Sequence, residues 1–323
     1  MNANISDPEY LHGHVVLPLP NGTRLDLAPQ DCWVLIKKLQ QYLTNNWDQF
    51  EPIPVRSILK NEKRFNVAIT CNAKFWELLE SGRWEPHTFD IFDDFISSES
   101  IYVDIGAWIG PTTLYASQYA KRAYAFEPDP VAYRELDINV RANSGADWAS
   151  RLTVFNKAIA CGNGTITIGN PECGGNSTSS MLFSSEATHW EVDAVTFERF
   201  ILQEHLQDEK MFIKMDIEGG EYEVLPSFRK AFQGGKIDLL LSLHPQFLTQ
   251  SFGQGKRSSL FGRMLRRLRC VWCHILLFRA LPFRYYYTGN GSRIVLTTAF
   301  LKAFLSGDFP AEVVATNRKW KKA

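Results

Sequence analysis

The stretch IKMDIEGGEYEVL, residues 213–225, places four carboxylates where an apolar strand turns into a helix. The residues that lead into it, MFI, are typical of a strand buried in a parallel sheet. Asp216 closes that strand, and Glu218, Glu221 and Glu223 follow. Glu218 and Glu221 can be explained as acids that cap the helix and favour its positive end, but Asp216 cannot. We therefore expect these acids to face a pocket, where a cation, a hydroxyl group or a metal offsets their repulsion, with Lys214 neutralising part of the charge.

Strands and helices alternate on both sides of this stretch. The expected strands have apolar residues at both odd and even positions, so both of their faces are predicted to be covered. Five such strands with helices between them indicate a parallel α/β sheet between two helical layers. An antiparallel hairpin is expected after them, with Asn290-Gly291 in its turn, and the run GTITI is expected to form an added hairpin strand. The five strands are expected within residues 101–107, 122–128, 152–160, 211–216 and 236–245.

The first hundred residues follow a different pattern, expected to be mainly helical with one hairpin. Asn21-Gly22 separates two short alternating runs, which predicts the hairpin. Apolar residues at helical spacing predict helices at residues 31–43 and 72–82. Aromatic residues of this region are interpreted as packing residues, with a lid over a pocket as the alternative. They are Phe75, Trp76 and Trp84.

The net charge of zero hides an asymmetry along the chain. Residues 251–323 hold 14 lysines and arginines but only Asp308 and Glu312, so this segment carries a net charge of +12 and the first 250 residues carry −12. Such a basic segment can bind phosphate or acidic lipid, or it can contact the acidic part of its own fold. Residues 259–278 are predicted to form a basic amphipathic helix within it. Packing of its apolar arc on the sheet is the expected role, and peripheral contact with a membrane is the alternative.

Several other properties are disfavoured by the sequence. The N-terminus lacks the pattern of a signal peptide, and no run of about 18 apolar residues is present to span a membrane. The six cysteines are scattered, which fits reduced thiols in a cytoplasmic protein. Cys270–His274 match the haem-attachment pattern but lie inside the amphipathic helix, so haem is not expected. Nucleic acid is not expected as a partner either, because the basic residues lack interleaved aromatic residues near the predicted site.

Candidate site residues lie at the carboxyl ends of the expected strands, where open parallel sheets bind ligands. Asp104 ends the first strand, and Gly106 and Gly110 allow a tight turn beside a ligand. Their spacing, D-x-G-x-x-x-G, is not that of a loop that binds a diphosphate. Glu127 closes the second strand, where a carboxylate can accept hydrogen bonds from both hydroxyls of a ribose. His244 ends the fifth strand and is a candidate general base, because the pKa of histidine lies near working pH.

The motifs taken together resemble the FkbM-type methyltransferases that depend on S-adenosylmethionine. YVDIGAWIGPTTLYAS, AYAFEPDP, NKAIACGNG and FIKMDIEGGEYEVL carry the resemblance over about residues 95–247. It implies a class I methyltransferase fold, a Rossmann-like seven-stranded sheet whose last strand is antiparallel. The first ninety residues and the basic C-terminal segment lie outside the resemblance. Three regions are expected along the chain: an N-terminal extension at residues 1–95, the S-adenosylmethionine-binding domain at 96–300 and a basic C-terminal tail at 301–323.

The resemblance also implies roles for the strand-end residues. Asp216 would face the methyl-transfer site, together with Glu218 and His244. The methionine side of the cofactor would be held by Asp104, Gly106, Ala107 and Gly110. Its ribose would be held by Glu127 and Pro128, and its adenine would lie near Lys157 and Ala158. One departure is visible, since the family often has glutamate two positions before the histidine, where this chain has Ser242.

The resemblance leads to a hypothesis of O-methylation at a sugar hydroxyl, on a glycan, a glycolipid or a small glycosylated molecule. Either His244 or Asp216 would be the base. A divalent metal is compatible with Asp216, but one carboxylate at a strand end defines no metal site. Two alternatives are a binding protein without catalysis and a nicotinamide-dependent oxidoreductase, although the latter predicts a diphosphate loop that is missing. The sequence does not indicate the oligomeric state.

Overall fold

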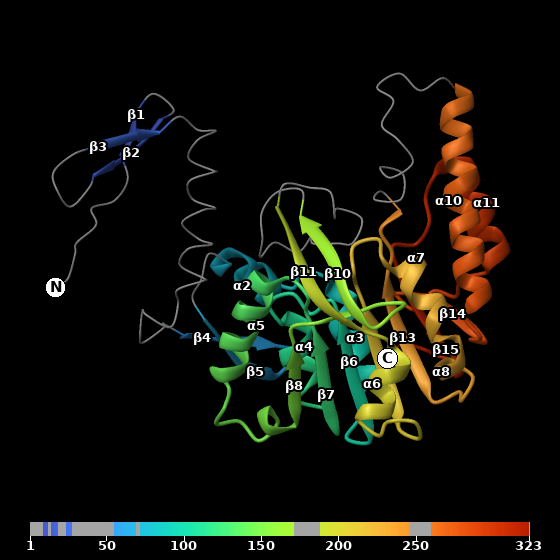
Figure 1. Ribbon diagram of the computed structural model, residues 1–323, viewed down its shortest axis with the longest axis horizontal. Coiled ribbons are helices and arrows are strands. Elements are labelled where there is room, and N and C mark those ends of the chain that lie inside the picture. Colours follow the sequence, from blue (N-terminus) through green and yellow to red (C-terminus); the bar gives the residue numbers. More distant parts are fainter. Residues whose placement is uncertain are drawn as a thin grey trace. The chain divides into compact units, whose positions relative to one another are not determined.

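The computed structural model describes residues 9–11, 14–18, 24–27, 55–68, 72–170, 188–245 and 260–322 (Figure 1). The chain divides into two compact units, residues 1–53 and 54–323. In the first unit, β1 (Glu9–Leu11), β2 (His14–Pro18) and β3 (Arg24–Leu27) form an antiparallel sheet in the order β1-β2-β3. The hairpin predicted from the alternating runs is confirmed by the β2–β3 pairing. Its Asn21-Gly22 turn and the helix predicted at residues 31–43 lie outside the described residues.

The second unit is built on a seven-stranded sheet in the order β14-β15-β13-β12-β6-β7-β8. The pairs β13-β12, β12-β6, β6-β7 and β7-β8 are parallel, whereas β15 is antiparallel to both of its neighbours. This confirms the expected class I sheet. Its strands are β6 (Ser100–Ile105), β7 (Arg122–Phe126), β8 (Leu152–Phe155), β12 (Lys210–Met215), β13 (Ile237–Ser242), β14 (Tyr285–Thr288) and β15 (Glu312–Thr316).

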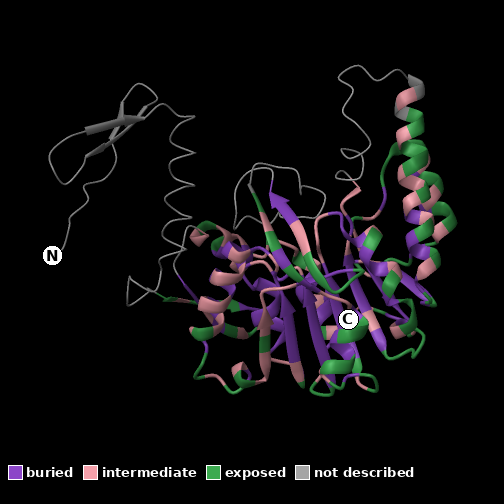
Figure 2. Cartoon of the chain, viewed as in Figure 1, coloured by how far each residue is buried: buried purple, intermediate pink, exposed green. Residues whose placement is uncertain are grey.

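Alternate residues of the central strands fill two separate cores, one on each face of the sheet. On one face, Ile101 and Ile213 pack in a cluster with residues of α6 (Phe197–Gln203), α10 (Leu260–Ala280) and α11 (Leu296–Ser306). On the other face, Tyr102 and Phe212 pack with residues of α2 (Ala73–Glu80), α3 (Pro86–Phe95) and α4 (Pro111–Ala116). The helices therefore cover both faces, as the unbroken apolar strands predicted (Figures 1 and 2).

The remaining elements connect and extend this core. α5 (Pro130–Arg141) lies between β7 and β8, and Asp129 caps it by accepting from Val131 N and Ala132 N. β10 (Gly164–Asn170) pairs antiparallel with β11 (Thr188–Val195), which confirms the added hairpin strand, and β11 also pairs with β9 (Ala158–Ile159). The helix expected around Pro226 consists of α7 (Glu221–Val224), a 3-10 turn at Leu225–Phe228 and α8 (Arg229–Phe232).

The hairpin predicted around Asn290-Gly291 is present, but its second arm is short. Thr288 N donates to Ser292 O, Ile294 N donates to Tyr286 O, and Tyr287 forms an antiparallel bridge with Arg293. The arm ends there because residues 296–306 form α11, in which Ala299 and Ala303 are buried at helical spacing. The antiparallel strand that pairs with β14 is β15, inside the segment expected to be a basic tail.

Residues 55–95 also differ from expectation. β4 (Val55–Lys60) and β5 (Lys63–Ala68) form a hairpin that the sequence analysis did not predict, although the predicted helix at residues 72–82 is confirmed as α2. Asn61 and Glu62, in its turn, both have positive φ, which is the signature of a type I′ turn. Because the described part of residues 1–95 holds five strands and two helices, it is not mainly helical. The boundary at residue 95 remains a prediction.

Candidate active site

A cavity of about 350 Å³ lies at the carboxyl ends of β6, β7 and β12. This volume is within the range of small-molecule sites. The structure brings together here most of the residues that the sequence singled out. They are Gly106, Ala107, Glu127, Pro128, Lys157, Ala158, Asp216, Glu218 and His244.

The turn after β6 forms part of the cavity wall and depends on Gly106. Gly106 N and Ala107 N donate to Phe126 O at 3.0 and 3.1 Å, which holds the turn against the end of β7. Gly106 has a φ of +88°, and a Cβ at this position would lie 1.8 Å from the carbonyl oxygen of Asp216. Glycine is therefore required both by backbone conformation and by space.

Gly106→Ala is consequently expected to displace the β6 turn from β12 and to abolish the cavity. We expect a loss of more than about 3 kcal/mol in the free energy of unfolding, because both backbone strain and a clash with backbone oppose the native turn. Urea unfolding followed by circular dichroism measures this loss. Gly162→Ala is the matched control, because a Cβ there meets nothing within 4 Å. Equal stability of the two variants would contradict the prediction.

Glu127 is buried at the end of β7 and holds two backbone groups. Its Oε2 accepts from Trp108 N at 2.7 Å, and its Oε1 accepts from Asp129 N at 2.8 Å. Burial raises the pKa of Glu127 to about 8. Because each carboxylate oxygen has a second lone pair, the side chain can still accept from hydroxyl groups in the cavity that it lines.

Asp104 and Gly110 are not among the residues that line the cavity, unlike the other residues expected to hold the cofactor. Asp104 is fully buried, and its Oδ2 accepts from Thr112 Oγ1 at 2.8 Å and from Thr113 Oγ1 at 2.7 Å. Burial raises the pKa of Asp104. Gly110, with a φ of +95°, precedes α4 as its N-cap. Both residues therefore position the first turn of α4, and Thr112 from that turn reaches the cavity instead.

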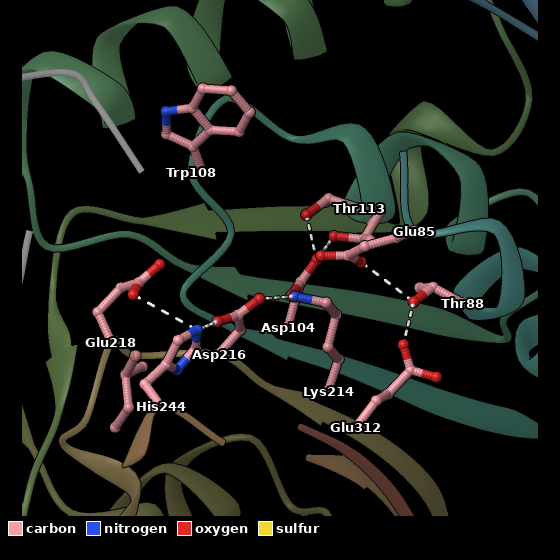
Figure 3. A network of polar contacts seen from close by, with 12 residues as sticks. Glu85, Thr88, Asp104, Trp108, Thr113, Lys214, Asp216, Glu218, His244 and Glu312 are labelled. Atoms are coloured by element: carbon pink, nitrogen blue, oxygen red, sulfur yellow. Dashed lines mark hydrogen bonds and ion pairs between the residues drawn. The ribbon is translucent and has the colours of Figure 1, made fainter. Parts of the chain in front are cut away.

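His244 lies beside Asp216 and Glu218 (Figure 3) and also contacts Glu221. We call these four residues the acid–histidine cluster. His244 Nε2 is 3.6 Å from Asp216 Oδ1 and 3.4 Å from Glu218 Oε2, while Nδ1 is 3.1 Å from Glu221 Oε1. Glu221 is fully buried, and its Oε1 also accepts from Ile217 N. The three candidate catalytic residues are thus in direct reach of one another, and Glu221 orients the imidazole ring.

The surroundings in the cluster shift the pKa values of His244, Asp216 and Glu218. Burial opposes a charged imidazole, but the hydrogen bond with Glu221 and the charges of Asp216 and Glu218 raise the pKa of His244 to about 9. Burial also opposes a charged Asp216, yet Lys214 and His244 lower its pKa below the usual value. Burial raises the pKa of Glu218 to about 7. An imidazolium therefore balances the acids in the absence of a ligand.

The same residues could hold a divalent cation. Asp216, Glu218 and His244 each offer one ligand atom, and these atoms lie within 4.8 Å of one another. Carboxylate oxygens and an imidazole nitrogen form a donor set used by several divalent metals. A metal was among the expected partners of the acids, but His244 was not predicted to join Asp216 and Glu218 as a ligand.

Lys214 lies on the side of Asp216 away from His244 (Figure 3). It is the cation of a second, buried group of charges that also contains Asp104 and Glu85. Its Nζ is 3.0 Å from Asp216 Oδ2, and Lys214 pairs across the sheet with Asp104. Burial would lower the pKa of Lys214, but the charges of Asp216, Glu85 and Asp104 raise it. The predicted partial neutralisation of the acids by Lys214 is confirmed.

Three buried or half-buried groups from distant segments complete this charge network and were not predicted. Glu85, just before α3, lines the cavity, and burial raises its pKa to about 7. Thr88 Oγ1 lies 3.0 Å from Glu85 Oε2 and 3.3 Å from Glu312 Oε2. Burial also raises the pKa of Glu312. The network therefore joins α3 and β15 to the ends of β6 and β12.

Aromatic rings form one side of the cavity, which we call the aromatic wall. It consists of Phe75, Trp84 and Trp108. Phe75 packs edge-on against Trp84 and Trp108, with ring centroids 5.1 and 4.6 Å apart. Trp76, in contrast, is buried in the core. The packing interpretation therefore holds for Trp76, whereas Phe75 and Trp84 contact the cavity.

The match to a haem-attachment pattern has a structural explanation. His274 is fully buried in α10, where its Nδ1 lies 2.7 Å from Cys270 O and its Nε2 lies 3.0 Å from Tyr222 Oη. Burial lowers the pKa of His274. It is thus a core histidine with both ring nitrogens engaged.

Comparisons with known proteins agree with this arrangement. The profile of the methyltransferase FkbM domain matches residues 104–280. A comparison with curated proteins finds no match. Among solved structures, a methyltransferase FkbM from Methylobacillus flagellatus KT is 26% identical, with a TM-score of 0.32, over 46% of this chain and 33% of that chain. The chain thus spans about a third of that protein.

Two other solved structures are similar at lower identity. A precorrin-6y C5,15-methyltransferase from Geobacter metallireducens GS-15 is 14% identical, with a TM-score of 0.28, over 52% of this chain and 70% of that one. A cyclopropane-fatty-acyl-phospholipid synthase-like protein from Lactobacillus casei ATCC 334 is 10% identical, with a TM-score of 0.32, over 64% and 57% of the two chains. Because the FkbM profile matches more than half of its residues and the seven-stranded sheet has the class I order, this chain belongs to the FkbM methyltransferase family.

Proposed function

We propose that the protein transfers a methyl group from S-adenosylmethionine to a hydroxyl of a sugar, free or carried on a glycan, a lipid or another small molecule. The observation that carries the proposal is the composition of one cavity. It combines the aromatic wall with the carboxylates of Glu85, Asp216 and Glu218 and with His244. A sugar ring presents C–H groups that pack on aromatic faces and hydroxyls that donate to carboxylates.

The residues of the cavity fit the cofactor. Glu127 would accept from the ribose hydroxyls, the turn at Gly106–Ala107 would allow close approach of the backbone, and Lys157 and Ala158, which also line the cavity, would lie near adenine. The carboxylates of Asp216 and Glu218 suit a cationic sulfonium. Bound there, S-adenosylmethionine would supply an electrophilic methyl group.

The chain itself positions the acceptor and removes its proton. Asp216 and Glu218 would accept hydrogen bonds from the acceptor and orient it, which removes much of the entropic cost of the reaction. His244 Nε2 would take the hydroxyl proton, because Glu221 holds Nδ1 and leaves Nε2 directed at Asp216 and Glu218. A cationic ligand beside His244 lowers the pKa of the imidazole and so increases its basic fraction at neutral pH.

Calorimetric titration with S-adenosylmethionine and, separately, with NADH tests the cofactor assignment. Micromolar binding of S-adenosylmethionine alone is expected and would justify a screen of sugar acceptors with a radiolabelled methyl group. Binding of NADH alone would favour an oxidoreductase. Tight binding of S-adenosylmethionine with no transfer to any hydroxyl compound would favour a binding protein on a methyltransferase fold.

Trp84→Ala tests the acceptor side of the same proposal. Loss of one wall of the acceptor subsite is expected to raise the KM for a sugar acceptor about tenfold, the effect of losing one good aromatic contact. The KM for S-adenosylmethionine, measured in the same variant, should change by less than about twofold, because Glu127 and the Gly106 turn are untouched. A variant that raises only the KM for the cofactor would show that the aromatic wall contacts the cofactor instead.

A further inference from the structure

The helix α10 has apolar side chains on two opposite sides. On one side His274, Leu277 and Phe278 are buried against the core. At 100° per residue, a second set falls within an arc of about 120° roughly opposite to them. These side chains are all exposed, by 40% to 56% of their surface. They are Met264, Leu265, Leu268, Trp272 and Leu276.

This exposed arc is unusual for a helix on a globular domain, whose outer face is normally polar. Figure 2 shows exposed residues along much of α10. The expectation that the apolar arc of this helix packs on the sheet is therefore wrong for most of the arc, because Met264, Leu265, Leu268 and Trp272 are exposed and the side with His274, Leu277 and Phe278 is buried instead. A contiguous apolar face of this kind marks an interaction site.

The charge of the helix indicates what kind of partner fits the exposed arc. Residues 260–280 contain five arginines and no acidic residue. On the same helical wheel, the exposed Arg269 borders the arc and the exposed Arg279 falls within it, whereas Arg267 lies on another side and donates to the carbonyl oxygens of Leu305 and Ser306. A second copy of the chain that covered the arc would bring further copies of Arg269 and Arg279 to the same surface, which disfavours pairing of two α10 helices. An anionic lipid surface neutralises these two arginines and accepts the apolar arc at the same time. Trp272, the most exposed member of the arc at 56%, is of the residue type enriched at membrane interfaces.

The topology places the start of α10 on the cavity side of the sheet. The chain leaves β13 at the carboxyl end of the strand, and α10 is the next helix described. Because β13 and β14 are both antiparallel to β15, β14 runs parallel to β13 and begins at the amino end of the sheet. The helix α10 must therefore run from the carboxyl end of the sheet back to its amino end. The cavity also lies at the carboxyl ends of the strands. Among the helices that the structure describes, none has the length and apolar content of a membrane span, so contact through α10 would be peripheral.

We propose that the exposed arc of α10, together with Arg269 and Arg279, binds the surface of membranes that contain anionic lipid. Flotation of the full chain with vesicles tests this. Vesicles of phosphatidylcholine with phosphatidylglycerol should carry the protein, whereas vesicles of phosphatidylcholine alone should carry at least about tenfold less, because each basic residue near an anionic surface adds about fivefold to partitioning. High salt should release the protein from the anionic vesicles.

Leu268→Glu with Trp272→Glu should reduce flotation with anionic vesicles at least about tenfold, since both the apolar contact and the charge are lost. Leu202→Glu is the matched control, because Leu202 is 53% exposed on α6 and lies outside the arc. Equal flotation of the double variant and the control would overturn the proposal. So would sedimentation equilibrium showing a dimer that the double variant loses, without vesicle binding, because that result would assign the arc to a second copy.

Discussion

His244→Gln is expected to lower kcat by about 10²- to 10⁴-fold, the usual contribution of a positioned general base. The glutamine amide can still donate to Glu221, so the ring's position is filled while the basic nitrogen is lost. Binding of S-adenosylmethionine, measured by calorimetry, should change by less than about threefold, because His244 is proposed to act on the acceptor. A loss of cofactor binding with an unchanged kcat would contradict the assignment of His244 as base.

The pH dependence of kcat/KM gives this prediction a second readout. The pKa of His244 is raised to about 9 in the ligand-free protein by Glu221, Asp216 and Glu218, and kcat/KM reports the pKa values of the free enzyme. Because the base must be unprotonated, kcat/KM should rise with pH from neutral towards pH 9 and then level off. In His244→Gln the rise should disappear, which a structural role for the histidine would not predict.

The same assay distinguishes a base from a metal ligand. If His244 acts only as base, dialysis against a chelator should leave kcat unchanged. Loss of activity on chelation, with recovery when Mg²⁺ or Mn²⁺ is added back, would instead assign Asp216, Glu218 and His244 as the metal ligands that their spacing permits.

The sequence located the acid–histidine cluster because the rules of parallel sheets bring strand ends together. Asp216 and His244 end neighbouring strands, β12 and β13, and the structure places them 3.6 Å apart. Glu127 was found for the same reason, as the residue that closes β7. Asp104 shows the limit of the rule, since its strand-end position does not say whether the side chain points at the cavity or under the next helix.

The charge network and the aromatic wall could not be predicted because their residues come from segments without a strand-end signal. In the charge network, Thr88 and Glu312 are 224 residues apart in the chain, and no pattern in the sequence joins α3 to β15. From the sequence, Trp84 and Phe75 could be core residues as well as residues that line a pocket. The turn signal at Asn290-Gly291 correctly predicted a hairpin, but not that its second arm ends before Leu296, where helical periodicity begins.

Lys214→Met is expected to be the most destabilising of the charge substitutions in the buried network, by about 3–5 kcal/mol at neutral pH. Lys214 is 3% exposed and forms an ion pair with Asp216 at 3.0 Å. Breaking a buried pair from one side leaves uncompensated charge in a low-dielectric site, which accounts for that magnitude. Lys121→Met is the matched control: its pair with Glu209 is on the surface, so it should cost less than about 1 kcal/mol.

A second substitution and a change of pH both test whether charge is the cause. Adding Asp216→Asn to Lys214→Met should restore part of the stability, because the neutral amide no longer needs the cation. The penalty of Lys214→Met should also shrink as the pH falls towards about 4, where carboxyl groups take up protons even in the unfolded chain. Urea unfolding across this pH range measures both effects. A penalty that stayed constant with pH and persisted in the double variant would mean that Lys214 stabilises the fold through packing of its alkyl chain, and not by compensating the acids that surround it.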